Sequence, residues 1–307
     1  MAGPGTTAGE MLRAVLRDLA RSVVERQPAA LADEPDAVHQ LRTAVRRLRN
    51  VLAAFGDLVD PATAGALRAR LSAYGDRLGL ARDLEVRAAD VRAAADAVGL
   101  APGPRDRLLR DLQVAHAAAH AQLVAWCRSD HGAALAAVLG TVLDDAGGVG
   151  PVGAAARPGD VVAAEVLLAQ ADRVLALGAD HLGDRDVAHT VRKAGRRLRH
   201  VADAVATPPA AVLGDEARAL GAAGATVQKL LGDHRDAGLL AEHVRSVVAL
   251  DGDAAASSAM VEHAEGRAAA ALADVPRALE DLAVLRARAQ ARRAPADGRV
   301  VNQAGDR

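Results

Sequence analysis

Apolar residues recur at three- and four-residue spacing along nearly the whole chain, from Glu10 to Gln290. This period places apolar side chains on one face of an α-helix, whereas a half-buried strand would need strict alternation. Aromatic residues make up only 1% of the 307 residues, and Ala and Leu are abundant. Ala and Leu are strong helix formers, while sheets draw on aromatic residues. The sequence therefore predicts an all-α protein.

Glycine and proline mark the interruptions between the predicted helices. The longest interruption covers residues 147–159, where Gly and Pro recur and charge is nearly absent. We interpret it as a linker between two helical segments, residues 10–146 and residues 160–290. We expect about six helices in each segment, arranged as a bundle. Residues 1–9 and 292–307 are predicted to be flexible tails.

The two segments carry the same pair of motifs in the same order. The first motif, HQLRTAVRRLR, begins at His39 and recurs as HTVRKAGRRLR from His189, an offset of 150 residues. The second motif, Leu-Gly-x-x-Arg-Asp, contains Gly79 and recurs around Gly232, an offset of 153 residues. Two motifs that repeat in order at nearly one offset indicate an internal duplication.

The first motif gathers basic residues on one face of each helix that carries it. At about 100° per residue, four of them fall within about 80° of arc. We call these two sets the basic stripes: His39, Arg42, Arg46 and Arg49 in the first copy, and His189, Arg192, Arg196 and Arg199 in the second. Like charges one turn apart destabilise a helix by about 0.2–0.5 kcal/mol per pair. The sequence keeps this repulsion twice, which favours an anionic partner.

A second interpretation of the basic stripes stays open at this point. Arginine runs on helices are often solvated faces, and carboxylates on other helices, such as Asp83 and Glu85, can pair with them. The repetition of the stripe at matched positions, including the histidine, favours the anion-binding interpretation over a solvated or salt-bridged face.

The duplicated motifs resemble those of the CHAD family, the conserved histidine α-helical domains. In that family a histidine and an arginine cluster are followed, in each half, by a Leu-Gly-x-x-Arg/Asn-Asp turn. The resemblance covers roughly residues 10–290. It implies two antiparallel helical bundles related by a pseudo-twofold axis, with basic residues lining a shared central cavity. Many CHAD domains are fused to a CYTH module, whose Glu-x-Glu-x-Lys stretch is not found here, so we expect a stand-alone member.

The CHAD resemblance also implies a ligand, inorganic polyphosphate, and for some members an association with polyphosphate granules. Polyphosphate carries about one negative charge per phosphate and has no bases. Guanidinium groups bind phosphate oxygens bidentately and keep their charge at any relevant pH. We therefore expect polyphosphate to bind along a track formed by the two Arg-rich helices, without a cofactor and without enzymatic activity.

The expected polyphosphate contacts fall into four groups. The arginines of the basic stripes come first: Arg42, Arg46, Arg49, Arg192, Arg196 and Arg199. Three residues beside the stripes either reach the edge of the track or pair with local acids: Arg47, Lys193 and Arg197. His39 and His189 either donate to phosphate or anchor the starts of their helices. Further contacts near the second motif are Arg82, Lys229 and Arg235.

Two other patterns are interpreted as structural or weak. Gly79 and Gly232 are predicted to end helices, because glycine readily takes the left-handed conformation needed there. Asp83 and Asp236 would then lie near the starts of the next helices, where a carboxylate is favourable. His116 and His120 are one turn apart, but without a third ligand nearby in the sequence no metal site is predicted.

Two further functions compete with polyphosphate binding. A basic groove attracts nucleic acid, but single-strand binders stack bases on aromatic side chains, which are almost lacking here. A phosphoester or polyphosphate hydrolase would use His39 or His189, yet no nucleophile or metal centre stands out. Docking of other granule proteins is compatible with the polyphosphate interpretation.

The expected location is the cytoplasm, on polyphosphate granules. Cys127 is the single cysteine, so it has no partner for an internal disulfide. The first residues lack the pattern of a secretory signal, and no apolar run is long enough to span a bilayer. The net charge of −1 excludes a uniformly basic surface but leaves room for a local basic site.

Overall fold

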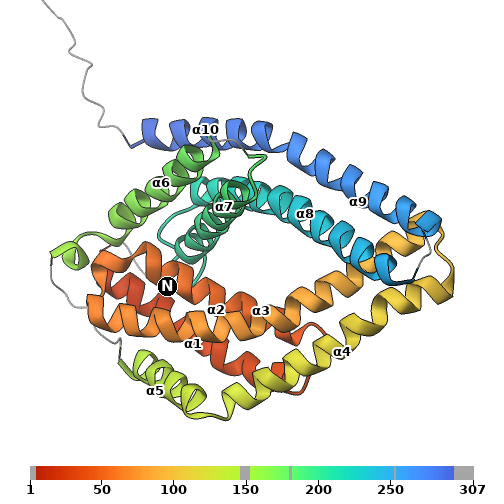
Figure 1. The fold of residues 1–307 in the computed structure, drawn as a ribbon. Helices are drawn as coiled ribbons and strands as arrows, with labels where there is room; N and C mark the ends of the chain where they lie inside the picture. Colours follow the sequence, from red (N-terminus) through yellow and green to blue (C-terminus); the bar gives the residue numbers. More distant parts are fainter. Residues whose placement is uncertain (1–4, 146–152, 180–181, 252–253, 294–307) are drawn as a thin grey trace, which may run out of the picture.

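The computed structural model of the chain describes residues 5–145, 153–179, 182–251 and 254–293, which form ten α-helices (Figure 1). The first five helices are α1 (Ala8–Leu31), α2 (Ala37–Ala54), α3 (Pro61–Val98), α4 (Pro102–Cys127) and α5 (Asp130–Asp145). The other five are α6 (Gly159–Gly178), α7 (Arg185–Ala206), α8 (Asp215–Asp251), α9 (Ala254–Ala273) and α10 (Val275–Ala291). Short 3-10 turns span Gly56–Leu58 and Gly153–Ala156. No strand element occurs in these ranges, so the all-α prediction is confirmed.

Local sequence explains where several helices begin and end. Thr7 and Glu10 form a capping box at the start of α1, in which each side chain accepts a hydrogen bond from the other's backbone N–H. Asp60 caps α3 by accepting from the backbone N–H of Thr63 at 2.8 Å. Gly99 ends α3 with a φ of 66°, a conformation that favours glycine. These caps satisfy backbone groups that a helix end leaves unpaired.

The predicted boundaries differ from the structure at three places. Each segment contains five α-helices in its described part, not six. Ala8 and Gly9, predicted to lie in a tail, are buried in α1. The backbone N–H of Gly159, the last residue of the predicted linker, donates to the carbonyl oxygen of Thr6 at 2.9 Å. The predicted linker and the predicted N-terminal tail are therefore hydrogen-bonded to each other. Residues 1–4, 146–152 and 294–307 of the predicted tails and linker lie outside the described residues.

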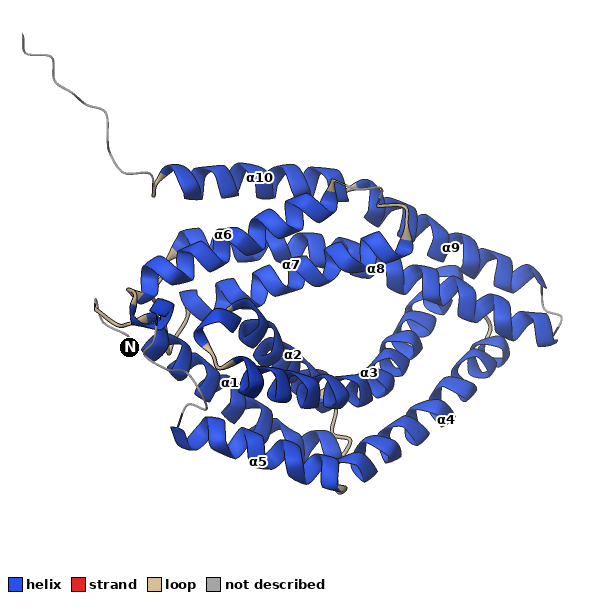
Figure 2. Cartoon of the chain, turned by 60° about the vertical axis from the view of Figure 1, so that its left-hand side comes forward, coloured by secondary structure: helices blue, strands red, loops and turns tan. Residues whose placement is uncertain are grey.

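The two segments share one large hydrophobic core. Leu41 and Leu48 of α2 and Val191 and Leu198 of α7 are fully buried in it. Figures 1 and 2 show α3–α4 and α8–α9 running outward from this core and meeting again at their far ends. A second, smaller apolar cluster joins these far ends, with Val91 of α3 packed among residues of α4, α8 and α9. The fold is therefore held together at two separate places.

The two segments follow a similar course through their helices. In each, the third helix is by far the longest, with 38 residues in α3 and 37 in α8. Asn50 of α2 and His200 of α7 are 150 positions apart, the offset of the first motif, and their side chains lie 2.9 Å apart. Contact between matching residues is expected where a twofold axis passes between two elements. The duplication and its pseudo-twofold axis stay predictions.

The prediction that Gly79 and Gly232 end helices is wrong. Both lie inside long helices, α3 and α8, and neither has the positive φ of a helix stop. A Cβ at Gly79 would lie 3.3 Å from the guanidinium Nη2 of Arg42, so glycine leaves room for that side chain. Gly232 lines the cavity described below. Asp83 and Asp236, expected at helix starts, therefore also lie within helices.

No helix in the described ranges is both long enough and apolar enough to cross a membrane.

The crossing of α7 and α8 depends on glycine. A Cβ at Gly195 would lie 2.8 Å from the carbonyl oxygen of Gly224, and a Cβ at Gly224 would lie 2.9 Å from that of Gly195. We predict that Gly224→Ala lowers the free energy of unfolding by about 1–3 kcal/mol, because neither backbone can yield without separating the helices. Denaturant unfolding followed by circular dichroism measures this change.

Gly238→Ala is the matched control in the same helix. A Cβ at Gly238 would meet no atom within 4 Å. Alanine should stabilise α8 there by up to about 1 kcal/mol through its helix propensity. Equal effects of the two substitutions would contradict the close approach at Gly195 and Gly224.

Candidate anion-binding site

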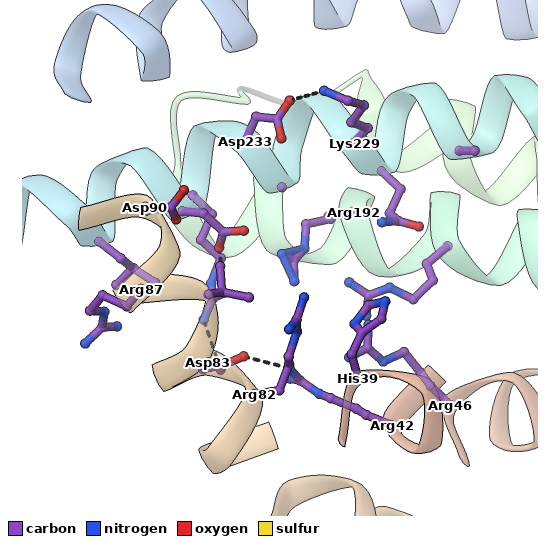
Figure 3. A pocket seen from close by; sticks show the side chains of 18 of the residues that line it. His39, Arg42, Arg46, Arg82, Asp83, Arg87, Asp90, Arg192, Lys229 and Asp233 are labelled. Carbon is purple, nitrogen blue, oxygen red and sulfur yellow. Dashed lines mark hydrogen bonds and ion pairs between the residues drawn. The ribbon is translucent and has the colours of Figure 1, made fainter. Parts of the chain in front are cut away.

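The basic stripes face a cavity that lies between the large hydrophobic core and the smaller apolar cluster. The apolar faces of α2 and α7 are buried in the large core, so their basic faces turn toward α3 and α8. A cavity of about 410 Å³ lies there, and we call it the central cavity. Figure 3 shows Arg42 reaching from α2 toward Asp83 on α3, and Arg192 pointing into the cavity from α7.

The lining of the central cavity combines many cations with four carboxylates. Its basic residues are His39, Arg42, Arg46, Arg82, Arg87, Arg192, Arg196, Arg199, Lys229 and Arg235. Its acidic residues are Asp83, Asp90, Asp233 and Asp236. Positive charge therefore exceeds negative charge around this cavity.

A second cavity of about 520 Å³ lies beside the first. Its charged lining residues are Arg46, Arg49, Arg68, Lys193, Arg196 and Arg197, and no carboxylate belongs to its described lining. We call it the acid-free cavity. Arg46 and Arg196 line both cavities, so their guanidinium groups stand where the two meet. Together the two cavities make one basic path past the crossing of α2 and α7.

Three arginines at or beside this junction lack an ion-pair partner among the described residues. Arg46, Arg192 and Arg196 form no ion pair within the parts of the chain that the structure describes. The Nε atoms of Arg192 and Arg196 are also buried without a hydrogen-bond partner among those residues. Burial of a charge without a counter-charge is costly, so these groups are prepared to accept an anion.

Burial and neighbouring arginines dominate the electrostatic environment of these side chains. Burial, followed by the charge of Arg42, lowers the pKa of Arg46 to about 9, although Asp83 acts in the opposite sense. Burial, followed by the charge of Arg46, lowers the pKa of Arg196 to about 8. Burial and the neighbouring Arg235 also lower the pKa of Arg192, which Asp236 and Asp83 partly offset. A guanidinium group keeps its proton at pH 7, so the folded protein holds these side chains as mutually repelling cations.

Other arginines of the site are paired, as the second interpretation of the stripes expected. Arg42 donates to Asp83 at 2.7 Å. Arg235 lies 3.2 Å from Asp236 and 3.9 Å from Asp83. Asp83 thus draws together an arginine from each segment, a role that differs from the helix start predicted for it. The charges of two further predicted phosphate contacts are also partly neutralised. Lys229 lies 2.6 Å from Asp233, and Arg199 lies 3.9 Å from Asp203.

The residues predicted beside the stripes divide between the cavity and the protein interior. Lys193 and Arg197 line the acid-free cavity, where Arg49 also lies and donates to Ser72 at 3.2 Å. Arg47 lines neither cavity, and its Nε is buried without a partner among the described residues.

The two motif histidines take different places. Both side chains are partly exposed to solvent, but His39 lines the central cavity, whereas His189 lines neither cavity. Burial, followed by the charge of Arg82, lowers the pKa of His39. Burial, followed by the charge of Lys193, lowers the pKa of His189. Both imidazoles are therefore neutral at pH 7 unless a bound anion raises these pKa values.

A buried histidine fixes the crossing of α2 and α7. His200 is 5% exposed and lies among Arg46, Arg47 and Arg196. Burial and these charges lower its pKa to about 3, so the imidazole is neutral and its Nδ1 accepts from Asn50 at 2.9 Å. The hydrogen bond joins the two segments directly beside the junction of the cavities.

Sequence reasoning missed several cavity residues. Arg68 and Arg87 of α3 and Gln228 of α8 belong to the lining but to neither repeated motif. The sequence offers only their closeness to predicted contacts, since Arg87 follows Arg82 by five residues and Gln228 directly precedes Lys229. Placing them in the site requires the packing of α3 and α8 against the stripes.

These features define an all-helical protein with an arginine-lined interior path. The family model of the CHAD domain matches residues 14–245, and the chain therefore belongs to the CHAD family. No curated protein is similar to it in sequence.

Solved structures share the fold at low sequence identity. PptA from Streptomyces chartreusis is 22% identical with a TM-score of 0.64, over 93% of this chain and 100% of that one. The CHAD domain from the plant Ricinus communis is also 22% identical with a TM-score of 0.64, over 95% of this chain and 94% of that one. At this identity the likeness shows the fold alone.

Removing one of the unbalanced charges should stabilise the protein when no anion is bound. We predict that Arg196→Gln raises the melting temperature by about 2–4 °C at low ionic strength, which corresponds to about 1 kcal/mol. The exposed Arg277 of α10 serves as control, and Arg277→Gln should change stability by less than about 0.5 kcal/mol. Differential scanning calorimetry in a buffer without phosphate measures both. A lower melting temperature for Arg196→Gln would contradict the repulsion described here.

Proposed function

We propose that this protein binds inorganic polyphosphate along the path formed by the central and acid-free cavities. The observation that carries the proposal is a set of half-buried guanidinium groups that form no ion pair among the described residues: Arg46, Arg192 and Arg196. A charge-assisted hydrogen bond contributes about 1.5–3 kcal/mol. Phosphate oxygens at the junction of the cavities would form several such bonds and relieve the repulsion at the same time.

The extent of the basic path favours a chain of phosphates over a single phosphate. Cations continue from Arg82 and Arg235 in the central cavity, through Arg46 and Arg196, to Arg68 in the acid-free cavity. One phosphate would reach only a few of them. A linear polyanion neutralises successive guanidinium groups, and its release of counterions adds a salt-sensitive contribution to binding.

The lining of the path disfavours nucleic acid as the ligand. No Phe, Tyr or Trp belongs to the described lining of either cavity. Single-stranded nucleic acid usually binds with its bases stacked on such side chains. Polyphosphate has no bases, so the absence of aromatic side chains from the lining does not weaken its binding.

The proposed role is binding and not catalysis. The described lining of the central cavity contains no Ser, Thr, Tyr or Cys side chain, and Asp83 is held by Arg42 at 2.7 Å. Ser72 lines the acid-free cavity, where its hydroxyl accepts from Arg49 at 3.2 Å and no carboxylate of the described lining could serve as its base. We extend the proposal to the cell: the protein would act in the cytoplasm on polyphosphate granules, where other granule proteins are its expected partners.

The first test reverses the two charges that both cavities share. We predict that Arg46→Glu combined with Arg196→Glu weakens the binding of long-chain polyphosphate by at least about 100-fold, because two charge-assisted contacts are lost. Titration calorimetry at two salt concentrations measures the affinity, and circular dichroism checks that the helices persist. Wild-type binding should weaken steeply with salt.

A double variant with the same change in net charge is the control. Arg21→Glu with Arg277→Glu alters exposed residues of α1 and α10 that line neither cavity. This variant should bind polyphosphate within about threefold of wild type, a difference of about 0.7 kcal/mol. Equal weakening of both variants, or wild-type binding to duplex DNA as tight as to polyphosphate, would reject the proposal.

The pairing of Arg42 with Asp83 gives a second, opposite prediction. A phosphate that binds Arg42 competes with this carboxylate, so Asp83→Asn should tighten polyphosphate binding by about tenfold, or about 1.4 kcal/mol. Asp172→Asn removes an equal charge from a pair with Arg286 that lies outside both cavities, and it should leave the affinity unchanged. Weaker binding of Asp83→Asn would mean that Asp83 orients Arg42 for the ligand instead of competing with it.

A further inference from the structure

A second set of polar side chains meets outside the two cavities, where the loop after α1 approaches α3 and α4. Asp33 belongs to that loop, Glu85 to α3 and His116 to α4. One potential ligand atom from each lies within 4.8 Å of the others. We propose that these three residues bind a divalent transition-metal ion such as Zn²⁺.

The distances suit one ion. His116 Nε2 lies 3.2 Å from Glu85 Oε1 and 4.0 Å from Asp33 Oδ1. Zinc binds imidazole nitrogen and carboxylate oxygen at about 2.0–2.2 Å, so two ligands of one ion lie roughly 3–3.6 Å apart. All three ligand atoms lie within 4.8 Å of one another, so binding requires side-chain rotations that shorten the longest separation by at most roughly 1.2 Å.

Neighbouring residues contact two of the three proposed ligands. The second oxygen of Glu85 accepts from Arg82 at 2.9 Å, which leaves Oε1 turned toward His116. His120, one turn after His116, has its Nε2 2.9 Å from the carbonyl oxygen of Ala30 and 3.8 Å from Asp33 Oδ1. The hydrogen bond of His120 joins the last turn of α1, just before Asp33, to α4. Outer contacts of this kind orient metal ligands in known sites.

The backbone at Asp33 turns the chain after the end of α1. Asp33 has a φ of 54°, in the left-handed region that Asp adopts more often than most residues other than glycine. It comes two residues after the last residue of α1, and its backbone N–H donates to the carbonyl oxygen of Ala30 at 3.4 Å.

The local charge also calls for a cation. Arg82 lies 2.9 Å from Glu85 and 3.9 Å from Asp36, whereas the ion pairs of Asp33 among the described residues are with the histidines His116 and His120. The side chains of Glu85 and His116 are 25% and 22% exposed, and that of Asp33 is 46% exposed, so an ion can reach them from solvent. Mg²⁺ and Ca²⁺ prefer oxygen ligands alone, whereas one imidazole with two carboxylates suits Zn²⁺ and related metals.

Direct titration with the metal tests the proposal. Full-length protein without an affinity tag is titrated with ZnCl₂ by calorimetry, in a buffer free of polyphosphate. We expect one Zn²⁺ per chain with a dissociation constant in the micromolar range, about −8 kcal/mol by the usual conversion. Glu85→Gln and His116→Ala should each weaken binding by at least about tenfold.

Two controls separate this site from other causes of binding. His131→Ala removes an exposed histidine of α5 outside the cluster and should bind Zn²⁺ as wild type does. Glu85→Gln keeps the size of the side chain, so unchanged helicity and melting would exclude a loss through unfolding. Wild-type binding no tighter than about 1 mM, about −4 kcal/mol, or an equal loss in His131→Ala and His116→Ala, would overturn the proposal. Because polyphosphate is left out, neither outcome bears on the polyphosphate proposal.

Discussion

The arrangement of this molecule depends on apolar contacts that hold mutually repelling arginines close together inside it. Arg46, Arg192 and Arg196 remain charged, half-buried and unpaired within the described residues. Such a cluster persists only when other interactions keep the helices in place. The apolar faces of α2 and α7 supply these interactions, because they share a core that is fully buried at Leu48 and Leu198. Stability and the proposed anion binding therefore make opposite demands on the same residues.

The second apolar cluster explains how the repulsion can be tolerated without opening the fold. It joins α3–α4 to α8–α9 beyond the central cavity, around Val91 and Leu240. The basic residues are thus enclosed between two anchored ends, and the cavities form between rigid helices. A preformed site of this kind loses little conformational entropy when a ligand binds. The polar link between Asn50 and His200 adds a fixed point beside the junction.

Much of this arrangement could be predicted from the sequence, because it follows from periodicity on single helices. The all-α fold, the two basic stripes and the cation-lined site follow from residues at fixed spacing, as at Arg42 and Arg46. The prediction that the Leu-Gly motif ends a helix is wrong, because Gly79 inside a helix has the same local sequence pattern as a glycine at a helix end. The pairing of Arg42 with Asp83 and the meeting of Asp33 with His116 depend on packing between distant helices, for which a single sequence holds no local signal.

The most direct measurement is a crystal structure of the protein with polyphosphate bound. It should show consecutive phosphates passing between Arg46 and Arg196, with oxygens within hydrogen-bond distance of Arg192 and with density in both cavities. The arginines should move little, because the helices already hold them in place. Phosphates bound only on the outer surface, with Arg46 and Arg196 unchanged and without a ligand, would contradict the central claim that these buried charges are the binding site.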